Sequence, residues 1–218
     1  ENDGRRDFDL SGLAAISDAE YARLAPVRWP CPSLGKGKER FFAAGGYFTP
    51  DRRARFVPTP ARAPIHAPTS HYPLRLNTGR VRDQWHTMTR TGRVPRLMAH
   101  RPEPTLDVHP DDASRLSLVD GGLARIESRH GASVLPVRVS PDQRPGEVFV
   151  AMHWTDRFSS AGPIDRLVGA VTDPVSGQPE LKATPVRAEP VPIRWRGLLL
   201  HREPLRPAGG PDCHWSRV

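Results

Sequence analysis

Between positions 72 and 153, apolar residues alternate with polar ones in several short runs. Such runs predict β-strands with one buried face at 72–76, 105–109, 123–128, 133–139 and 147–153. A short helix is expected at 111–116, where Pro110 and acidic residues favour a helix start, and Asp120 to Gly122 predicts a turn. This order of elements predicts a mainly β chain with short helices, closed into a small barrel.

The segments on either side of this region are irregular and rich in proline. Ser17 to Glu20 predicts the start of a short helix, and residues 164–168 predict one helical turn. The proline-rich run 57–70 is typical of a linker. We expect three parts: residues 1–70 as an irregular segment and linker, 71–190 as the barrel, and 191–218 as a tether leading into a further domain. Both ends of the chain are expected to be cut from a longer protein.

The composition limits the partners that the chain can have. A net charge of +8 and a pI near 10.4 favour an anionic partner, which could be nucleic acid, a membrane surface, a phosphate-bearing cofactor or an acidic protein. Cys31 and Cys213 are far apart and form no CxxC pair, so neither an iron–sulfur nor a zinc site is expected in this chain. No apolar run approaches the length of a membrane span.

One stretch, residues 77–91 (NTGRVRDQWHTMTRT), contains most of the candidate chemistry. A turn is expected at Thr78 to Arg80, with glycine allowing a backbone geometry that other residues resist. Its dense hydrogen-bonding side chains need a polar partner if they are buried, and its arginines favour phosphate oxygens. A solvated basic loop stays open as the alternative, although the presence of Trp85 argues against it.

The stretch resembles the opening motif of the C-terminal domain of molybdenum oxidoreductases that carry two molybdopterin guanine dinucleotides, and it is most similar to assimilatory nitrate reductases. Residues 46–56 (GYFTPDRRARF) and 172–182 (TDPVSGQPELK) support the same resemblance, which covers roughly residues 29–189. It implies a double-psi six-stranded β-barrel of the formate dehydrogenase and DMSO reductase type, related to the aspartate decarboxylase barrel.

The resemblance also implies a set of cofactor-binding residues. These are Thr78, Gly79, Arg80, Val81, Arg82, Asp83, Gln84, Trp85, His86, Thr87, His153, Asp165 and Lys182. Asp165 stands where many relatives carry asparagine, and an ionised aspartate accepts hydrogen bonds without donating any. No catalytic residue and no metal ligand is expected in this chain, because the molybdenum ligand and the iron–sulfur cluster would belong to upstream domains and the redox chemistry to the cofactor.

For the whole protein, the resemblance implies reduction of nitrate to nitrite in the cytoplasm, with an electron-donating protein or domain and without nucleic-acid or membrane partners. Formate dehydrogenase, from the same superfamily, is an alternative. A basic nucleic-acid-binding module is an alternative of another class, permitted by 32 Lys and Arg residues. Its weakness is that the few aromatic residues are not interleaved with the basic ones as a stacking platform requires. A standalone structural barrel is the third alternative.

Overall fold

The structure is a computed structural model that describes residues 9–35, 40–202 and 214–217. The chain forms two compact units, Glu1–Ala61 and Arg62–Val218. The first contains a 3-10 helix, η1 (Ser11–Leu13), and the helix α1 (Asp18–Ala22). Ser17 caps α1, because its hydroxyl accepts from the Glu20 N–H while the Glu20 carboxylate accepts from the Ser17 N–H at 2.8 Å. The predicted helix start is therefore confirmed.

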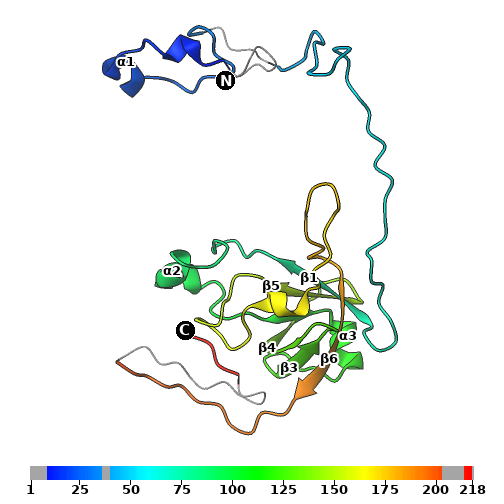
Figure 1. The fold of residues 1–218 in the computed structure, drawn as a ribbon. Helices are drawn as coiled ribbons and strands as arrows, with labels where there is room; N and C mark the ends of the chain where they lie inside the picture. Colours follow the sequence, from blue (N-terminus) through cyan, green and yellow to red (C-terminus); the bar gives the residue numbers. More distant parts are fainter. Residues whose placement is uncertain (1–8, 36–39, 203–213, 218) are drawn as a thin grey trace. The chain divides into compact units, whose positions relative to one another are not determined.

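The second unit is built on six strands that close into a barrel (Figure 1). They are β1 (Leu74–Gly79), β2 (Leu106–Val108), β3 (Leu123–Glu127), β4 (Ala132–Val139), β5 (Glu147–Ala151) and β6 (Thr184–Val191). Their order around the barrel is β1-β5-β2-β4-β3-β6. Strand β5 lies between β1 and β2, parallel to β1, and β2 lies between β4 and β5, parallel to β4. Each of these two strands is inserted between two others, and the two interlocked arrangements make the barrel a double-psi barrel, as expected.

The alternation of the sequence explains which side chains fill the barrel. In β1, Leu74, Leu76 and Thr78 are buried while the residues between them are partly exposed. The other strands contribute to the same core with Leu106, Val108, Ala124, Ile126, Leu135, Val137, Val148, Val150, Val186 and Ala188. The turn expected at Thr78 to Arg80 is wrong, because β1 runs on through Gly79.

Short helices lie in the connections between the strands. The predicted helix near 111–116 is present as α3 (Pro110–Arg115), whose N-cap His109 accepts from the Asp111 N–H through Nδ1 at 3.1 Å. The predicted turn at 164–168 is the 3-10 helix η3 (Ile164–Leu167). Two further elements, η2 (Thr91–Arg93) and α2 (Pro95–Met98), follow the motif region and lie in the connection from β1 to β2.

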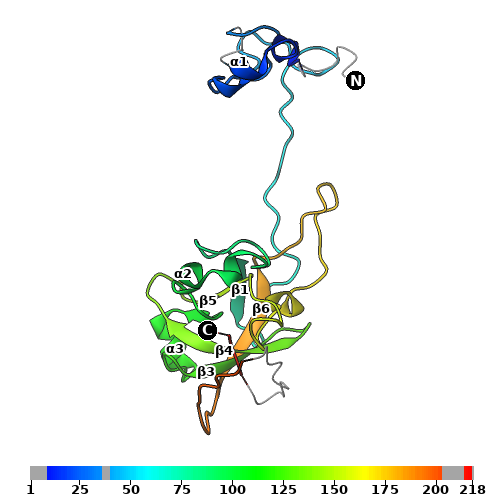
Figure 2. The same cartoon turned by 90° about the vertical axis from the view of Figure 1, so that its left-hand side faces the viewer.

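The strand register brings the three connections that matter here to one end of the barrel. Gly79 pairs with Ala151, Leu106 with Val150, and Leu76 with Thr184. The connections 80–105 and 152–183 and the hairpin 128–131 therefore open at the same end, here called the loop end, while 109–122 and 140–146 lie at the other. Figure 2 shows the barrel from a second side, and in both views the loop around 172–179 projects away from it.

The last described residues return to the barrel unit. Ser216 pairs with Ser159, and the Trp215 carbonyl accepts from the Ser160 N–H at 2.9 Å. A further domain after residue 191 stays a prediction, as do the other domain boundaries. None of the helices in the described part of the chain is both long and apolar enough to span a bilayer.

Candidate functional site

The end of β1 is tied to the segment that leads into β6. The Thr78 hydroxyl, which is buried, donates to the Leu181 carbonyl at 2.8 Å, and the Lys182 ammonium donates to the Thr78 carbonyl. Two parts of the chain about a hundred residues apart, each from one of the motifs that carry the resemblance, thus meet at the loop end.

Gly79 is at this junction, and the reason for a glycine differs from the one expected. Its φ is not in the left-handed region, since it is an ordinary strand residue. A Cβ at this position would lie 2.8 Å from Cε2 of Phe149 and 3.7 Å from the Lys182 nitrogen. The glycine is therefore required by the close approach of Phe149, a residue that the sequence did not single out.

Beyond Gly79, the chain folds over a small apolar cluster separate from the main core. Val81 and Met88 are buried there together with Ala151 and Trp154, and Phe149, Phe158 and Met98 pack around them. Val81 and Met88 therefore fix the two ends of the polar segment between them. Met88 has a left-handed φ of 56°, and its N–H donates to the Trp85 carbonyl at 3.2 Å, which closes the loop on itself.

His153 follows β5 and lies beneath this loop, fully buried. Its Nε2 accepts from the Val81 N–H at 2.9 Å, and its Nδ1 lies 3.1 Å from the His86 carbonyl. A nitrogen that accepts from an N–H carries no proton, so the imidazole is neutral with its proton on Nδ1. Burial lowers the pKa of His153, which favours the same neutral form.

Gln84 points inward from the loop. Its amide nitrogen donates to the Leu97 carbonyl at 3.2 Å, whereas its Oε1 is buried without a hydrogen-bond partner. The Asn77 Oδ1 and the Trp154 Nε1 are also buried and unpaired. Arg75 Nε and Arg187 Nε are buried and unpaired as well, so lack of a partner does not by itself mark a ligand site, but the three atoms near the loop can accept hydrogen bonds from a polar ligand or donate them to it.

The charged residues of the loop fall into two groups. Arg82 is paired with Asp83 at 3.0 Å, and Asp83 also contacts His100 at 3.1 Å. The hydrogen bond from Arg82 is the main reason why the pKa of Asp83 is lowered. Arg80 and Lys182 have no carboxylate partner among the described residues, so their charges are available to an anionic ligand.

Trp85 does not pack into the barrel, as its side chain is 64% exposed. The Arg80 guanidinium carbon lies 5.9 Å from the centroid of the Trp85 ring, and the His86 ring lies 4.8 Å away on an edge-to-face contact. Arg80, Trp85 and His86 therefore form an exposed aromatic and cationic platform, which suits stacking against a planar ligand.

Two of the predicted residues lie apart from this arrangement. Thr87 is exposed on the surface of the loop. Asp165 is exposed at the start of η3, which packs against β4. Since β4 is three strands away from β1 in either direction around the barrel, no described contact joins Asp165 to Gly79 or Lys182.

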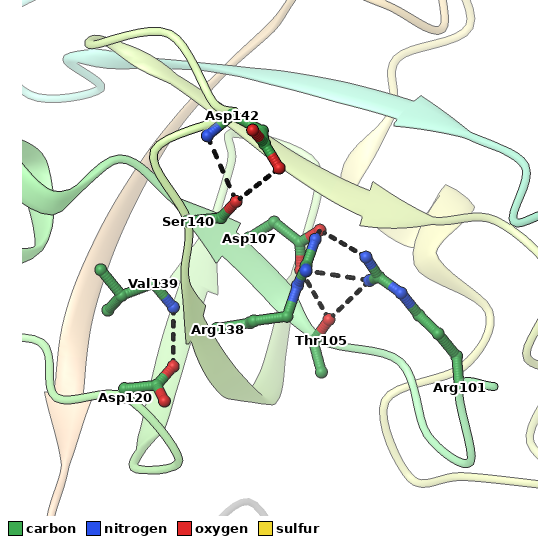
Figure 3. Close-up of polar contacts among 8 residues, drawn as sticks. All are labelled: Arg101, Thr105, Asp107, Asp120, Arg138, Val139, Ser140 and Asp142. Carbon is green, nitrogen blue, oxygen red and sulfur yellow. Dashed lines mark hydrogen bonds and ion pairs between the residues drawn. The ribbon is translucent and has the colours of Figure 1, made fainter. Parts of the chain in front are cut away.

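A buried ion-pair network holds the far end of the connection 80–105 and was not foreseen from the sequence (Figure 3). Asp107 of β2 is 1% exposed and pairs with Arg101 at 3.0 Å and with Arg138 of β4 at 2.6 Å. Burial alone would raise the pKa of Asp107, but hydrogen bonds from Arg138, Arg101 and Thr105 outweigh it and lower the pKa. A single aspartate inside an apolar strand is the only sequence signal of this network.

The described residues contain no group of three or more His, Cys, Asp or Glu side chains placed to hold a metal ion. Cys31 is buried and free, and Cys213 lies outside the described residues. The loop end around Gly79 brings together two cations without a carboxylate partner among the described residues, three unpaired buried polar atoms and an aromatic platform.

Such a loop end on a closed barrel has the charge and the aromatic surface that suit an anionic, partly planar ligand. Residues 74–185, just over half of the chain, match the sequence family described as "Molydopterin dinucleotide binding domain", and the chain belongs to that family. Strands β1 to β5 and both motif regions at the loop end fall inside the matched segment, whereas β6 begins inside it and runs on to Val191.

The relatives include a nitrate reductase of Klebsiella oxytoca, 46% identical over 100% of this chain and 24% of its own length. The assimilatory nitrate reductase catalytic subunit of Bacillus subtilis is 32% identical over 85% of this chain and 26% of its own. A periplasmic nitrate reductase of Desulfovibrio desulfuricans is 34% identical over 73% and 22%. The chain thus spans about a quarter of the length of these relatives.

Proposed function

We propose that this chain holds one molybdopterin guanine dinucleotide in a molybdenum oxidoreductase that reduces nitrate to nitrite, of the assimilatory type. The family match and the names of the relatives support the cofactor and the substrate. The observation that carries the proposal is the junction at Gly79, where Lys182 and Arg80 offer unpaired positive charge beside a glycine that Phe149 approaches closely.

Each part of the site has a role toward such a cofactor. Arg80 and Lys182 would bind its phosphate oxygens or its carbonyl groups, because cationic donors to anionic acceptors make the strongest hydrogen bonds. Gln84 Oε1, Asn77 Oδ1 and Trp154 Nε1 would find polar partners. The Trp85 ring would stack on a planar part of the ligand or of a neighbouring domain. The cofactor supplies the redox chemistry at its molybdenum, and this chain supplies binding and orientation.

The remaining parts of the proposal concern the whole protein. The molybdenum ligand and an iron–sulfur cluster would be held outside this chain, and an electron-donating protein or domain would reduce that cluster. We place the enzyme in the cytoplasm with the assimilatory relatives, although a periplasmic nitrate reductase is also similar. Formate oxidation is the competing activity, since a formate dehydrogenase subunit of Methanocaldococcus jannaschii matches 78% of this chain.

Two dye assays on the native gene product, purified from cells grown with molybdate, distinguish nitrate reduction from formate oxidation. Reduced viologen dye with nitrate tests nitrate reduction, and oxidised dye with formate tests formate oxidation on the same preparation. Dye oxidation that depends on nitrate, with nitrite accumulating in step and no turnover of formate, is the expected result. Turnover of formate alone would replace nitrate reductase by formate dehydrogenase and leave the cofactor assignment in place.

A further inference from the structure

Both ring nitrogens of His153 are used inside the protein, which sets this residue apart from the other candidates. One nitrogen accepts from the Val81 N–H at 2.9 Å and the other is 3.1 Å from the His86 carbonyl. These two backbone groups bracket the segment that contains Arg82, Asp83, Gln84 and Trp85. Neither nitrogen of His153 is left for a ligand.

Among the described residues, the Val81 N–H and the His86 carbonyl have no other hydrogen-bond partner than the imidazole. The loop between them is not a helix or a strand, and its own hydrogen bonds, from the Gln84 N–H to the Val81 carbonyl at 3.4 Å and from the Met88 N–H to the Trp85 carbonyl at 3.2 Å, leave the Val81 N–H and the His86 carbonyl to the imidazole. A buried N–H without an acceptor costs free energy comparable to a lost hydrogen bond, and the loop would open to water to avoid that cost. The pairing of the Val81 N–H therefore depends on a side chain that follows β5, 72 residues further along the chain.

We propose that His153 is a positioning residue: it clamps the backbone of residues 81–86 and so presents Arg80 and Gln84 to the cofactor without touching the cofactor itself. The part of this inference that concerns the cofactor rests on the proposed function, whereas the clamp rests on the two contacts alone. The rigid end of β5 is thereby coupled to the geometry of the binding loop.

Two conservative substitutions of His153 each keep one of its two hydrogen bonds, the one to the Val81 N–H or the one to the His86 carbonyl, and remove the other. The amide of His153→Gln reaches the position of Nε2, so it keeps an acceptor for the Val81 N–H. The amide of His153→Asn reaches only the position of Nδ1, so it keeps a donor for the His86 carbonyl and leaves Val81 unpaired. His153→Leu removes both. Val108→Ala, which opens a cavity in the main core away from the loop, is the control for general destabilisation.

Hydrogen–deuterium exchange of the native gene product, followed in a peptide that spans residues 79–88, measures the clamp directly. The expected result is exchange faster by about tenfold or more in His153→Leu and His153→Asn, near wild-type exchange in His153→Gln, and little change in Val108→Ala. Wild-type exchange in His153→Leu would overturn the clamp. So would an increase in Val108→Ala as large as in His153→Leu, because the effect would then be general.

The guanine nucleotide released from the same preparations tests the link to the cofactor. Lower nucleotide content in His153→Leu and His153→Asn, with recovery in His153→Gln, supports positioning. Faster exchange with unchanged nucleotide content would overturn the link and leave the clamp in place. A wild-type protein that contains no guanine nucleotide would overturn the proposed function itself, whatever the exchange shows.

Discussion

The Lys182 ammonium donates a hydrogen bond to the main-chain carbonyl of Thr78, although the two residues are 104 positions apart. The contact joins the last residues of β1 to the segment before β6, and the Thr78 hydroxyl completes the junction by donating to the Leu181 carbonyl at 2.8 Å. Gly79 lies next to it and allows Phe149 to approach. Two distant motifs thus form one surface at the loop end of the barrel.

Lys182→Met is expected to lower the guanine nucleotide content of the native gene product while leaving the barrel folded. Lys182 is exposed and makes one hydrogen bond to the Thr78 carbonyl, so its replacement should change the free energy of unfolding by no more than about 1 kcal/mol. Nucleotide released by acid and chemical denaturation measure the two effects. Arg144→Met, an exposed residue at the opposite end with the same loss of charge, is the control. Equal nucleotide loss in both variants would mean that only net charge matters.

Gly79→Ala is expected to destabilise the protein by about 1–3 kcal/mol, because the new Cβ would collide with the Phe149 ring at 2.8 Å. The same substitution should lower nucleotide content, since the loop that follows would be displaced. Phe149→Leu combined with Gly79→Ala removes the obstacle and should recover part of the stability in a double-mutant cycle. Strictly additive effects would show that contact with Phe149 is not the reason for the glycine.

Asp107→Asn is expected to cost about 1–3 kcal/mol, because it removes the buried anionic partner of Arg101 and Arg138, whose guanidinium groups can still be partly solvated. The folded-state pKa of Asp107 is below its ordinary 3.8, so its ionised form stabilises the wild type above that pH. This contribution disappears as the pH falls below 3.8 toward the folded-state pKa, and the two proteins should converge there. Asp156→Asn, at an exposed position, should change stability by less than about 0.5 kcal/mol.

The buried His153 makes the free energy of unfolding depend on pH as well, but here the folded state favours the neutral form of the side chain, not the ionised form. Its folded-state pKa is below 6.5, so the unfolded chain takes up a proton first and the wild type loses stability as the pH falls below 6.5. His153→Gln lacks this loss, and the stability difference between the two proteins should shrink between about pH 7 and pH 5, by at most about 1.4 kcal/mol per pH unit. Arg80 and His86 also influence the charge on this residue. A difference independent of pH would contradict a neutral His153.

The sequence predicted five of the six strands because they alternate in the way that a half-buried strand requires, but it missed β6 (Thr184–Val191), which lies in a flanking segment expected to be irregular. Leu74 and Leu76 face the core as their spacing suggests, whereas Thr78, expected in a turn, continues the same buried face of β1. What the spacing could not reveal is closure: the parallel pairing of β1 with β5 depends on contacts between residues more than seventy positions apart. The same is true of Gly79, where local propensity suggested a turn but a ring from β5 imposes the glycine.

The sequence indicated which motifs form the candidate site, but it did not indicate how their side chains are paired. The motif residues do gather at one end with Lys182 and His153, but the sequence could not tell that His153 bonds to the loop rather than facing outward. Asp165 lies on the opposite side of the barrel from Gly79. The ion pairs of Asp107 with Arg101 and Arg138 were not predicted from the sequence. These features depend on which side chains meet in space, and a single sequence does not contain that information. Binding of the cofactor by the predicted residues stays a prediction, and for His153, whose two ring nitrogens bond within the protein, we propose positioning in place of direct contact.

The most direct test of the central claim is the molybdenum and guanine nucleotide content of the native gene product, compared with that of an Arg80→Met, Lys182→Met double variant. The wild type should contain about two guanine nucleotides per molybdenum, as two dinucleotides on one metal require, and the double variant should lose a large part of them while its barrel stays folded. A wild type grown with ample molybdate that contains neither, or a folded double variant with undiminished nucleotide, would contradict the claim that this loop end holds the cofactor.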